Sequence, residues 1–243
     1  MGLDNTKRIC LWSGPRNIST AFMYAFAQRE DTVVYDEPLY GYYLKESVAD
    51  AYHPGALEVL QNMELDGDKV VQMMLGPQPK SVAFFKQMTH HLLDLDRGFM
   101  QDMEHLILTR DPRFMLPSFA KEIPNPTMQD VGYEAHLELI QYLESIGKRP
   151  IIIDSKKLLM NPEKFFLSLC DALNLTYHSR MLHWQKGGRS EDGPWAKYWY
   201  KSVHASNGFL KYEEKEVSIS PDLKPLLKRC IPIYEQLIQR SFY

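Results

Sequence analysis

Short apolar runs alternate along this chain with segments of helix length, and no other feature constrains its fold as strongly. The runs with the length and composition of buried strands are residues 8–13, 32–37, 81–88, 105–110 and 149–155. The segments expected to form helices are residues 19–30, 40–50, 54–64, 111–122, 131–147, 161–175 and 221–239, while 69–75 fits either a strand or a helix. Strands that are separated by helices pair in parallel. The chain is therefore predicted to form an α/β three-layer sandwich around a central, mostly parallel sheet.

The composition is that of an ordinary folded protein, and it argues against several classes of function. Hydrophobic residues make up 44% of the 243 residues and charged residues 24%, which is enough for a sizeable core. No repeat or Pro-, Gly- or Ser-rich linker divides the chain, so we predict a single domain over residues 1–243. The 28 basic and 31 acidic side chains give a formal net charge of −3, which argues against a nucleic-acid partner.

The sequence also favours a cytoplasmic location without a membrane partner. It has no stretch of roughly 18 apolar residues, and its N-terminus lacks the apolar core of a signal peptide. Cys10, Cys170 and Cys230 lie in apolar stretches without a Cys-x-x-Cys pair, as expected of buried thiols in a reducing compartment. Gly2 and Thr6 match a loose myristoylation pattern that often occurs by chance. The oligomeric state stays open.

The loop Gly14-Pro15-Arg16-Asn17-Ile18-Ser19-Thr20 lies between the first predicted strand and the first predicted helix. Anions bind at this place in α/β sheets, because backbone N–H groups and the helix dipole face them there. Arg16 would add a charged fork, and Ser19 and Thr20 would add hydroxyls. The alternative is a capped helix start, since Ser19 and Thr20 are good N-cap residues. The loop lacks the lysine of the nucleotide-triphosphatase P-loop, which disfavours a kinase or an ATPase.

Three further segments follow this loop in a recognisable order. The first is a motif of Arg110 and Ser118, separated by seven residues, which lies at a second junction between a predicted strand and a predicted helix. Residues 151–175 read as a strand, an Asn-Pro-Glu turn and a helix, and residues 185–199 form a late loop rich in Lys, Gly and Trp. With these four segments in order, the chain resembles the sulfotransferase superfamily that uses 3′-phosphoadenosine 5′-phosphosulfate (PAPS), from about residue 7 to residue 200.

This resemblance implies a P-loop-NTPase-like sulfotransferase fold, PAPS as the donor, adenosine 3′,5′-bisphosphate (PAP) as the product, and no required metal. It assigns the loop from Gly14 to Thr20 to the 5′-phosphosulfate, and Arg110 with Ser118 to the 3′-phosphate. Lys186, Arg189 and Trp195 would be further nucleotide contacts. The expected activity is transfer of the sulfuryl group to a hydroxyl or amine of a small molecule by in-line displacement, with Arg16 stabilising the charge on the phosphosulfate bridge.

Two kinds of side chain are candidates for the general base. Glu37 ends the second predicted strand, beside the first loop, and related sulfotransferases place a glutamate base in an equivalent segment. If the strand continues, Asp36 points the opposite way, so only one of the two carboxylates is expected in the site. His90 is the second candidate, because a histidine with a pKa near neutrality suits this role. Lys86 is expected to be a charge partner of the transferred group.

The acceptor is not identified by the sequence. Residues 38–65 are the expected acceptor wall, with the aromatic and histidine side chains Tyr40, Tyr42, Tyr43, Tyr52 and His53. A P-loop kinase of nucleotides or small molecules is the alternative enzyme, and it would depend on ATP and magnesium. A non-catalytic nucleotide-binding protein of the same fold is the alternative from another class of function.

Overall fold

A five-stranded parallel sheet forms the centre of the molecule in a computed structural model that describes residues 6–214 and 216–243. Its strands are β1 (Lys7–Ser13), β2 (Thr32–Asp36), β3 (Val82–Met88), β4 (Glu104–Thr109) and β5 (Ile151–Asp154). They lie in the order β2-β3-β1-β4-β5, and every neighbouring pair is parallel. The predicted α/β fold is thereby confirmed. Gly2, and with it the myristoylation pattern, lies outside the described residues.

Side chains alternate between the two faces of the sheet along each strand, and helices cover both faces. On one face, Ile9 and Leu11 of β1 pack in a core with Phe22 and Phe26. The helices that cover this face are α1 (Ser19–Ala27), α8 (Ser155–Met160) and α9 (Pro162–Ala172).

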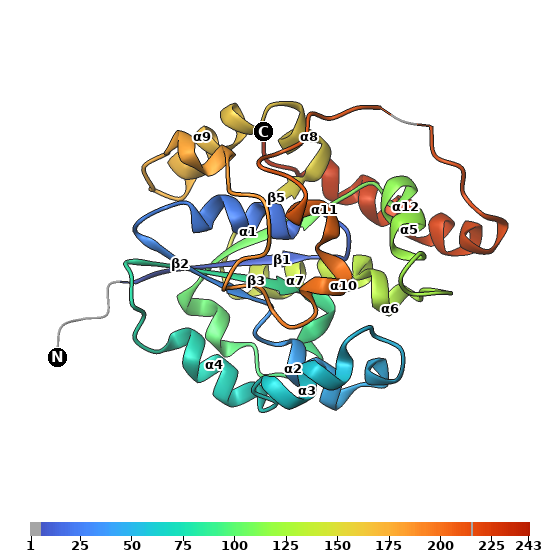
Figure 1. Cartoon of the computed structure of the whole chain (residues 1–243), viewed down its shortest axis with the longest axis horizontal. Helices are drawn as coiled ribbons and strands as arrows, with labels where there is room; N and C mark the ends of the chain where they lie inside the picture. The colour runs from blue at the N-terminus through green and yellow to red at the C-terminus, as the bar shows by residue number, and fades with distance from the viewer. Residues whose placement is uncertain (1–5, 215) are drawn as a thin grey trace.

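The opposite face of β1 carries Cys10 and Trp12, which belong to a second core. The helices that cover it are α4 (Gly67–Leu75), α7 (Tyr133–Ser145) and α12 (Lys224–Gln239). The ambiguous segment 69–75 is therefore helical, and Asp66 caps α4 by accepting hydrogen bonds from the backbone N–H groups of Asp68 and Lys69. Figure 1 shows α8 and α9 on one side of the sheet and α4 on the other.

Several of the remaining helices carry residues that line the cavity described below. The remaining helices are α2 (Tyr40–Glu46), α3 (Ala56–Asn62), α5 (Pro112–Phe119), α6 (Met128–Val131), α10 (Ala196–Trp199) and α11 (Lys201–His204). Gly132 has a φ of 73° and separates α6 from α7 (Tyr133–Ser145), so the helix predicted over 131–147 begins after this glycine. Within residues 6–214 and 216–243, no helix has both the length and the apolar character needed to cross a membrane.

Candidate active site

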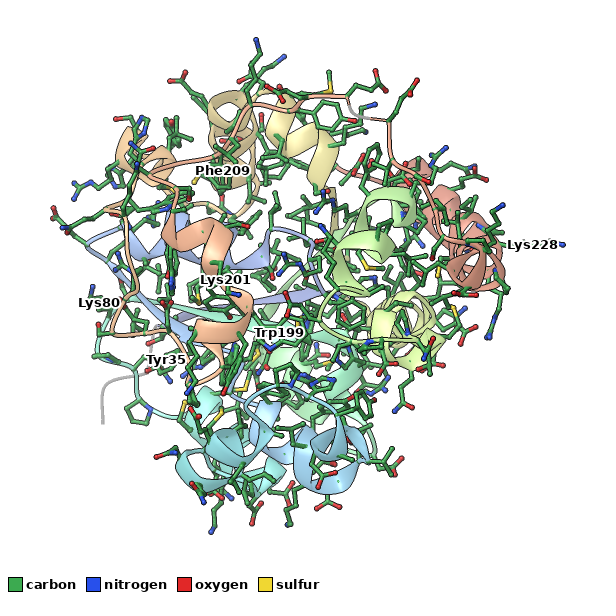
Figure 2. The ribbon with its side chains drawn as sticks, turned by 45° about the vertical axis from the view of Figure 1, so that its right-hand side comes forward. Tyr35, Lys80, Trp199, Lys201, Phe209 and Lys228 are labelled. Carbon is green, nitrogen blue, oxygen red and sulfur yellow. The ribbon has the colours of Figure 1, made fainter. Side chains whose placement is uncertain are left out.

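A cavity of about 450 Å³ opens at the carboxyl ends of the central strands. Carboxyl ends of parallel strands meet at one edge of a sheet, so the segments that follow β1, β2 and β3 come together there. Most residues predicted for the site line this cavity: Pro15, Arg16, Asn17, Ile18, Ser19, Thr20, Glu37, Lys86, His90, Arg110, Ser118 and Trp195. Figure 2 shows that Trp199 and Phe209, which also line it, lie on the segment of chain that runs through α10 and α11.

The start of α1 faces this cavity without a side-chain cap. Ile18 is the N-cap residue, with a φ of 63°, and no side chain of the described residues caps the helix. Ser19 and Thr20 are the first residues of the helix and line the cavity, so the capped-start alternative is wrong. The N–H groups of the first turn of a helix lack partners within the helix, and they favour an anion.

Two residues fix the loop that precedes α1. The Asn17 side chain is buried and donates from Nδ2 to the Leu108 carbonyl of β4, 3.2 Å away. Gly14 packs against the end of α6, where an added Cβ atom would lie 2.9 Å from the Val131 carbonyl oxygen. Gly14 therefore positions the loop through backbone packing, and it is not among the residues that line the cavity.

Arg16, Arg110 and Ser118 meet although they come from two distant motifs. Arg16 Nε donates to Ser118 Oγ at 3.0 Å, and Arg110 Nη1 donates to the Arg16 carbonyl oxygen at 2.6 Å. Both guanidinium groups are half-buried, and burial lowers the pKa of each, while Arg16 further lowers the pKa of Arg110 by repulsion. Within the described part of the chain, neither forms an ion pair with a carboxylate. Glu122 attracts Arg16 and Asp111 attracts Arg110 without forming an ion pair, so the two adjacent guanidinium groups remain able to bind an anion.

Glu37 lies at the other side of the cavity, in a buried ionic network. Lys86 Nζ donates to Asp36 Oδ1 at 2.8 Å, to Glu37 Oε1, and to the Tyr200 hydroxyl at 2.7 Å. Burial raises the pKa of Glu37, and the neighbouring Lys86 opposes that rise. Glu37 lines the cavity, so it can face a bound acceptor.

This network corrects two expectations. The strand β2 ends at Asp36 and Glu37 turns with a φ of 46°, so both carboxylates reach the same ammonium group instead of pointing to opposite faces. Lys86 is 1% exposed and its three N–H donors are all taken by Asp36, Glu37 and Tyr200. No donor of Lys86 is left for a transferred group, so its expected role as that group's charge partner is not supported by the geometry.

His90 also lines the cavity, but its surroundings make it a poor base. It lies after β3 in a buried turn with His91, and burial lowers its pKa to about 3. The expected pKa near neutrality is therefore wrong. Burial likewise lowers the pKa of His53 to about 4 and holds that of His91 well below its usual range. In residues 6–214 and 216–243, no group of three or more His, Cys, Asp or Glu side chains is arranged to hold a metal ion.

The predicted acceptor wall reaches the cavity at only two of its named positions. Tyr40 and His53 line it, and the Tyr40 hydroxyl lies 2.8 Å from His53 Nδ1. Tyr43 stacks on His91 behind them, with ring centroids 4.6 Å apart. Tyr52 donates its hydroxyl to Asp130 Oδ1 at 2.7 Å.

The late loop supplies a different set of residues from the predicted one. Trp195 is buried and lines the cavity as expected, but Lys186 is exposed and Arg189 lies over the Tyr24 ring, so neither lines it. Trp199 and Tyr200 line it instead. The aromatic run 195–200 is the signal in the sequence that could have identified them, since buried aromatic side chains with a polar tip often lie at binding sites.

Comparisons with known proteins agree with this architecture. A protein-family model described as "Sulfotransferase domain" matches residues 7–241. Among solved structures, the sulfotransferase domain of the Synechococcus PCC 7002 olefin synthase aligns with a TM-score of 0.57 at 12% identity, over 94% of this chain and 96% of that one. The sulfotransferase domain from the curacin biosynthetic pathway aligns with a TM-score of 0.53 at 15% identity, over 96% and 98% of the two chains. These structures share the fold.

Two curated relatives from Arabidopsis thaliana are more similar in sequence. They are the branched-chain-amino-acid aminotransferase-like proteins 2 and 1, each 39% identical over 228 residues, or 93% of this chain. The chain spans 40% of the length of each relative, so their names describe much longer proteins. Since the family match covers nearly the whole chain and solved sulfotransferase domains share its fold, the chain belongs to the sulfotransferase domain family.

Proposed function

We propose that this protein transfers a sulfuryl group from PAPS to a hydroxyl or amine of a small acceptor. The observation that carries the proposal is the pair of half-buried guanidinium groups, Arg16 and Arg110, which meet at one cavity without a carboxylate partner among the described residues. PAPS carries phosphate at both ends of its ribose, so it offers two anionic groups to two cations. The family to which the chain belongs agrees with this donor.

The residues around the cavity fit the two ends of such a donor. The open N-terminus of α1 and the Arg16 guanidinium would bind the 5′-phosphosulfate. Arg110 and Ser118 would bind the 3′-phosphate, as the family motif implies. When bound, PAPS supplies a sulfuryl group on a good phosphate leaving group. The half-buried Arg16 would stabilise negative charge more strongly there than it would in water.

Glu37 is the base that the geometry favours. The carboxylate lines the cavity, and its raised pKa makes it a better proton acceptor than an exposed glutamate. It would take the proton from the acceptor hydroxyl or amine as the new bond to sulfur forms. His90, whose pKa is about 3, would accept a proton poorly at neutral pH.

Thermal melting with PAP tests the donor site directly. A ligand present at a hundred times its dissociation constant stabilises the folded protein by about 2.7 kcal/mol. We expect PAP to raise the melting temperature of the wild-type protein, and Arg110→Ala to abolish the rise. Arg113→Ala is the matched control, because Arg113 lies three residues after Arg110 at the start of α5, is exposed and pairs with Asp111.

The same measurement with other nucleotides separates the alternatives. Stabilisation by ATP and magnesium without stabilisation by PAP would overturn the proposal in favour of a kinase. Stabilisation by PAP without transfer to any member of an acceptor panel would point to a non-catalytic nucleotide-binding protein. Transfer of ³⁵S-labelled sulfate from PAPS to an alcohol or amine acceptor is the expected result.

A further inference from the structure

The hydroxyl of Tyr200 has each of its hydrogen-bonding positions filled by a buried group. It accepts from Lys86 Nζ at 2.7 Å and from Trp195 Nε1 at 3.0 Å. It donates to the Asp36 carboxylate, whose two oxygens lie 2.9 and 2.8 Å away. A phenolic hydroxyl has one proton to donate, and here a carboxylate accepts it. This single oxygen atom therefore joins Lys86, Trp195 and Asp36, and hydrogen bonding also links it to Thr20 and to Glu37.

The groups that Tyr200 joins are those that hold Glu37. The Lys86 ammonium group donates one hydrogen bond each to Tyr200, Asp36 and Glu37. The Glu37 backbone is held as well, since its N–H donates to the Lys86 carbonyl oxygen at 2.7 Å. The three acceptors together fix the direction of the ammonium group.

Tyr200 belongs to a different part of the chain from the other members of the network. Asp36 and Glu37 end β2, and Lys86 belongs to β3, whereas Tyr200 lies between α10 and α11. The preceding residue, Trp199, accepts a hydrogen bond from Arg16 Nη1 through its carbonyl oxygen at 3.1 Å. Two consecutive residues thus contact both the anion-binding arginine and the network around the carboxylate. Figure 2 labels Trp199 and Lys201, the neighbours of Tyr200 in the chain.

We propose that Tyr200 is a positioning residue for Glu37, and that residues 199 and 200 fix the distance between the base and the arginine that binds the donor. This inference rests on the proposed function, because it assigns Glu37 its role as a base. Tyr200 acts on Glu37 through Lys86 and Asp36 and through its own hydroxyl, which hydrogen-bonds to the Glu37 carboxylate.

The charges that face Glu37 allow a test in which two substitutions shift the pKa of Glu37 in opposite directions. Lys86 on β3 and the nearby Tyr200 hydroxyl lower the pKa of Glu37, whereas Asp36 on β2 raises it by repulsion. Tyr40 of α2 faces the same carboxylate, and burial, together with the charge of Glu37, raises the pKa of the Tyr40 phenol. Loss of the Tyr200 hydroxyl should therefore raise the pKa of Glu37, and loss of the Asp36 charge should lower it.

The experiment compares Tyr200→Phe and Asp36→Asn with the wild-type protein. Carbon-13 NMR of the glutamate carboxyl groups follows the titration of Glu37 in the ligand-free protein, with Glu37→Gln identifying the signal. We expect Tyr200→Phe to move the titration to higher pH by about one pH unit and Asp36→Asn to move it to lower pH. The acidic limb of the pH profile of kcat should move in the same two directions, and kcat of Tyr200→Phe should fall about tenfold.

Tyr198→Phe is the matched control, because Tyr198 lies on α10, is half-buried and does not belong to the network. It should leave both titrations unchanged, and the melting shift with PAP should survive in all three variants. Shifts of the same sign in Tyr200→Phe and Asp36→Asn, or none in Tyr200→Phe, would overturn the proposal. If Tyr200→Phe fails to fold, the Glu37 titration in Asp36→Asn becomes the test. A shift to lower pH supports the network, and a shift to higher pH overturns it. A wild-type protein without transferase activity would contradict the proposed function, while the NMR titration would still test the positioning.

Discussion

Arg16, Ile18 and Glu37 have φ values of 58°, 63° and 46°, although none of them is a glycine. Left-handed backbone costs such residues roughly 1–2 kcal/mol each, so the surrounding contacts must hold it in place. Here Arg110 donates to the Arg16 carbonyl, and the Glu37 N–H donates to the Lys86 carbonyl. All three residues line the cavity. Leu93, Asn125, Asn174 and Tyr243 also have positive φ values but do not line the cavity, so part of the backbone strain lies where the proposed chemistry occurs.

Replacement of Glu37 by Gln tests the base at the residue scale. The amide has nearly the same shape but cannot accept a proton at neutral pH, so we expect kcat to fall roughly 10²- to 10⁴-fold. The melting shift with PAP should persist, because the donor site lies with Arg16 and Arg110. Glu58→Gln, on α3 and paired at the surface with Lys197, is the control. A variant that keeps wild-type kcat would assign the base elsewhere.

Several residues of the candidate site could be predicted from the sequence, and others could not. The spacing of Arg110 and Ser118, together with the Arg16 loop, indicated side chains that the structure brings within hydrogen-bond distance. The joint contact of Asp36 and Glu37 with Lys86 was missed, since strand alternation fails where a residue other than glycine turns left-handed. Tyr200 was missed because its charged partners, Lys86 and Asp36, are more than a hundred positions away in the chain.

At the scale of elements, the loop before α1 is fitted against the end of α6. We expect Gly14→Ala to destabilise the protein by about 1–3 kcal/mol, because its Cβ atom would lie 2.9 Å from the Val131 carbonyl oxygen. Urea unfolding measures this change. Gly98→Ala is the control, since its Cβ atom would meet only the Asp96 side chain, at 3.3 Å. Equal stabilities of the two variants would mean that the loop relaxes freely.

The strands were predictable because each is a short apolar run buried on both faces. The segment 69–75 needed its N-terminal cap, Asp66, to be recognised as a helix. The helices α6, α8, α10 and α11 were not predicted. Each has four to six residues, so its apolar pattern spans less than two turns and shows no period.

At the scale of the whole molecule, buried neutral histidines should make the protein sensitive to acid. Burial lowers the pKa to about 3 for His90 and to about 4 for His53, His105 and His136. In the unfolded chain these groups titrate near 6.5, so between about pH 6.5 and pH 4 the unfolded state binds more protons. The contribution of these histidines to the free energy of unfolding is fully present above this pH range. It falls as the pH falls through the range, by about 2 kcal/mol per histidine at pH 5.

Urea unfolding at pH 7 and pH 5 measures this loss, and one variant isolates a single group. His136 is buried, with no hydrogen-bond partner for either ring nitrogen among the described residues. His136→Leu should reduce the difference in unfolding free energy between the two pH values by about 2 kcal/mol. His183→Leu, at an exposed position, should leave that difference as it is. A wild-type protein equally stable at both pH values would contradict the prediction.

The placement of Tyr200 also has a consequence for protein synthesis. A ribosome makes the chain from its N-terminus, so Asp36, Glu37 and Lys86 are translated well before the hydroxyl that completes their network. Until then the carboxyl ends of β2 and β3 hold two carboxylates against one ammonium group, without the neutral fourth partner. The nascent protein can form most of its sheet early. Its proposed catalytic base is assembled only after the segment beyond α9 has been translated and has docked.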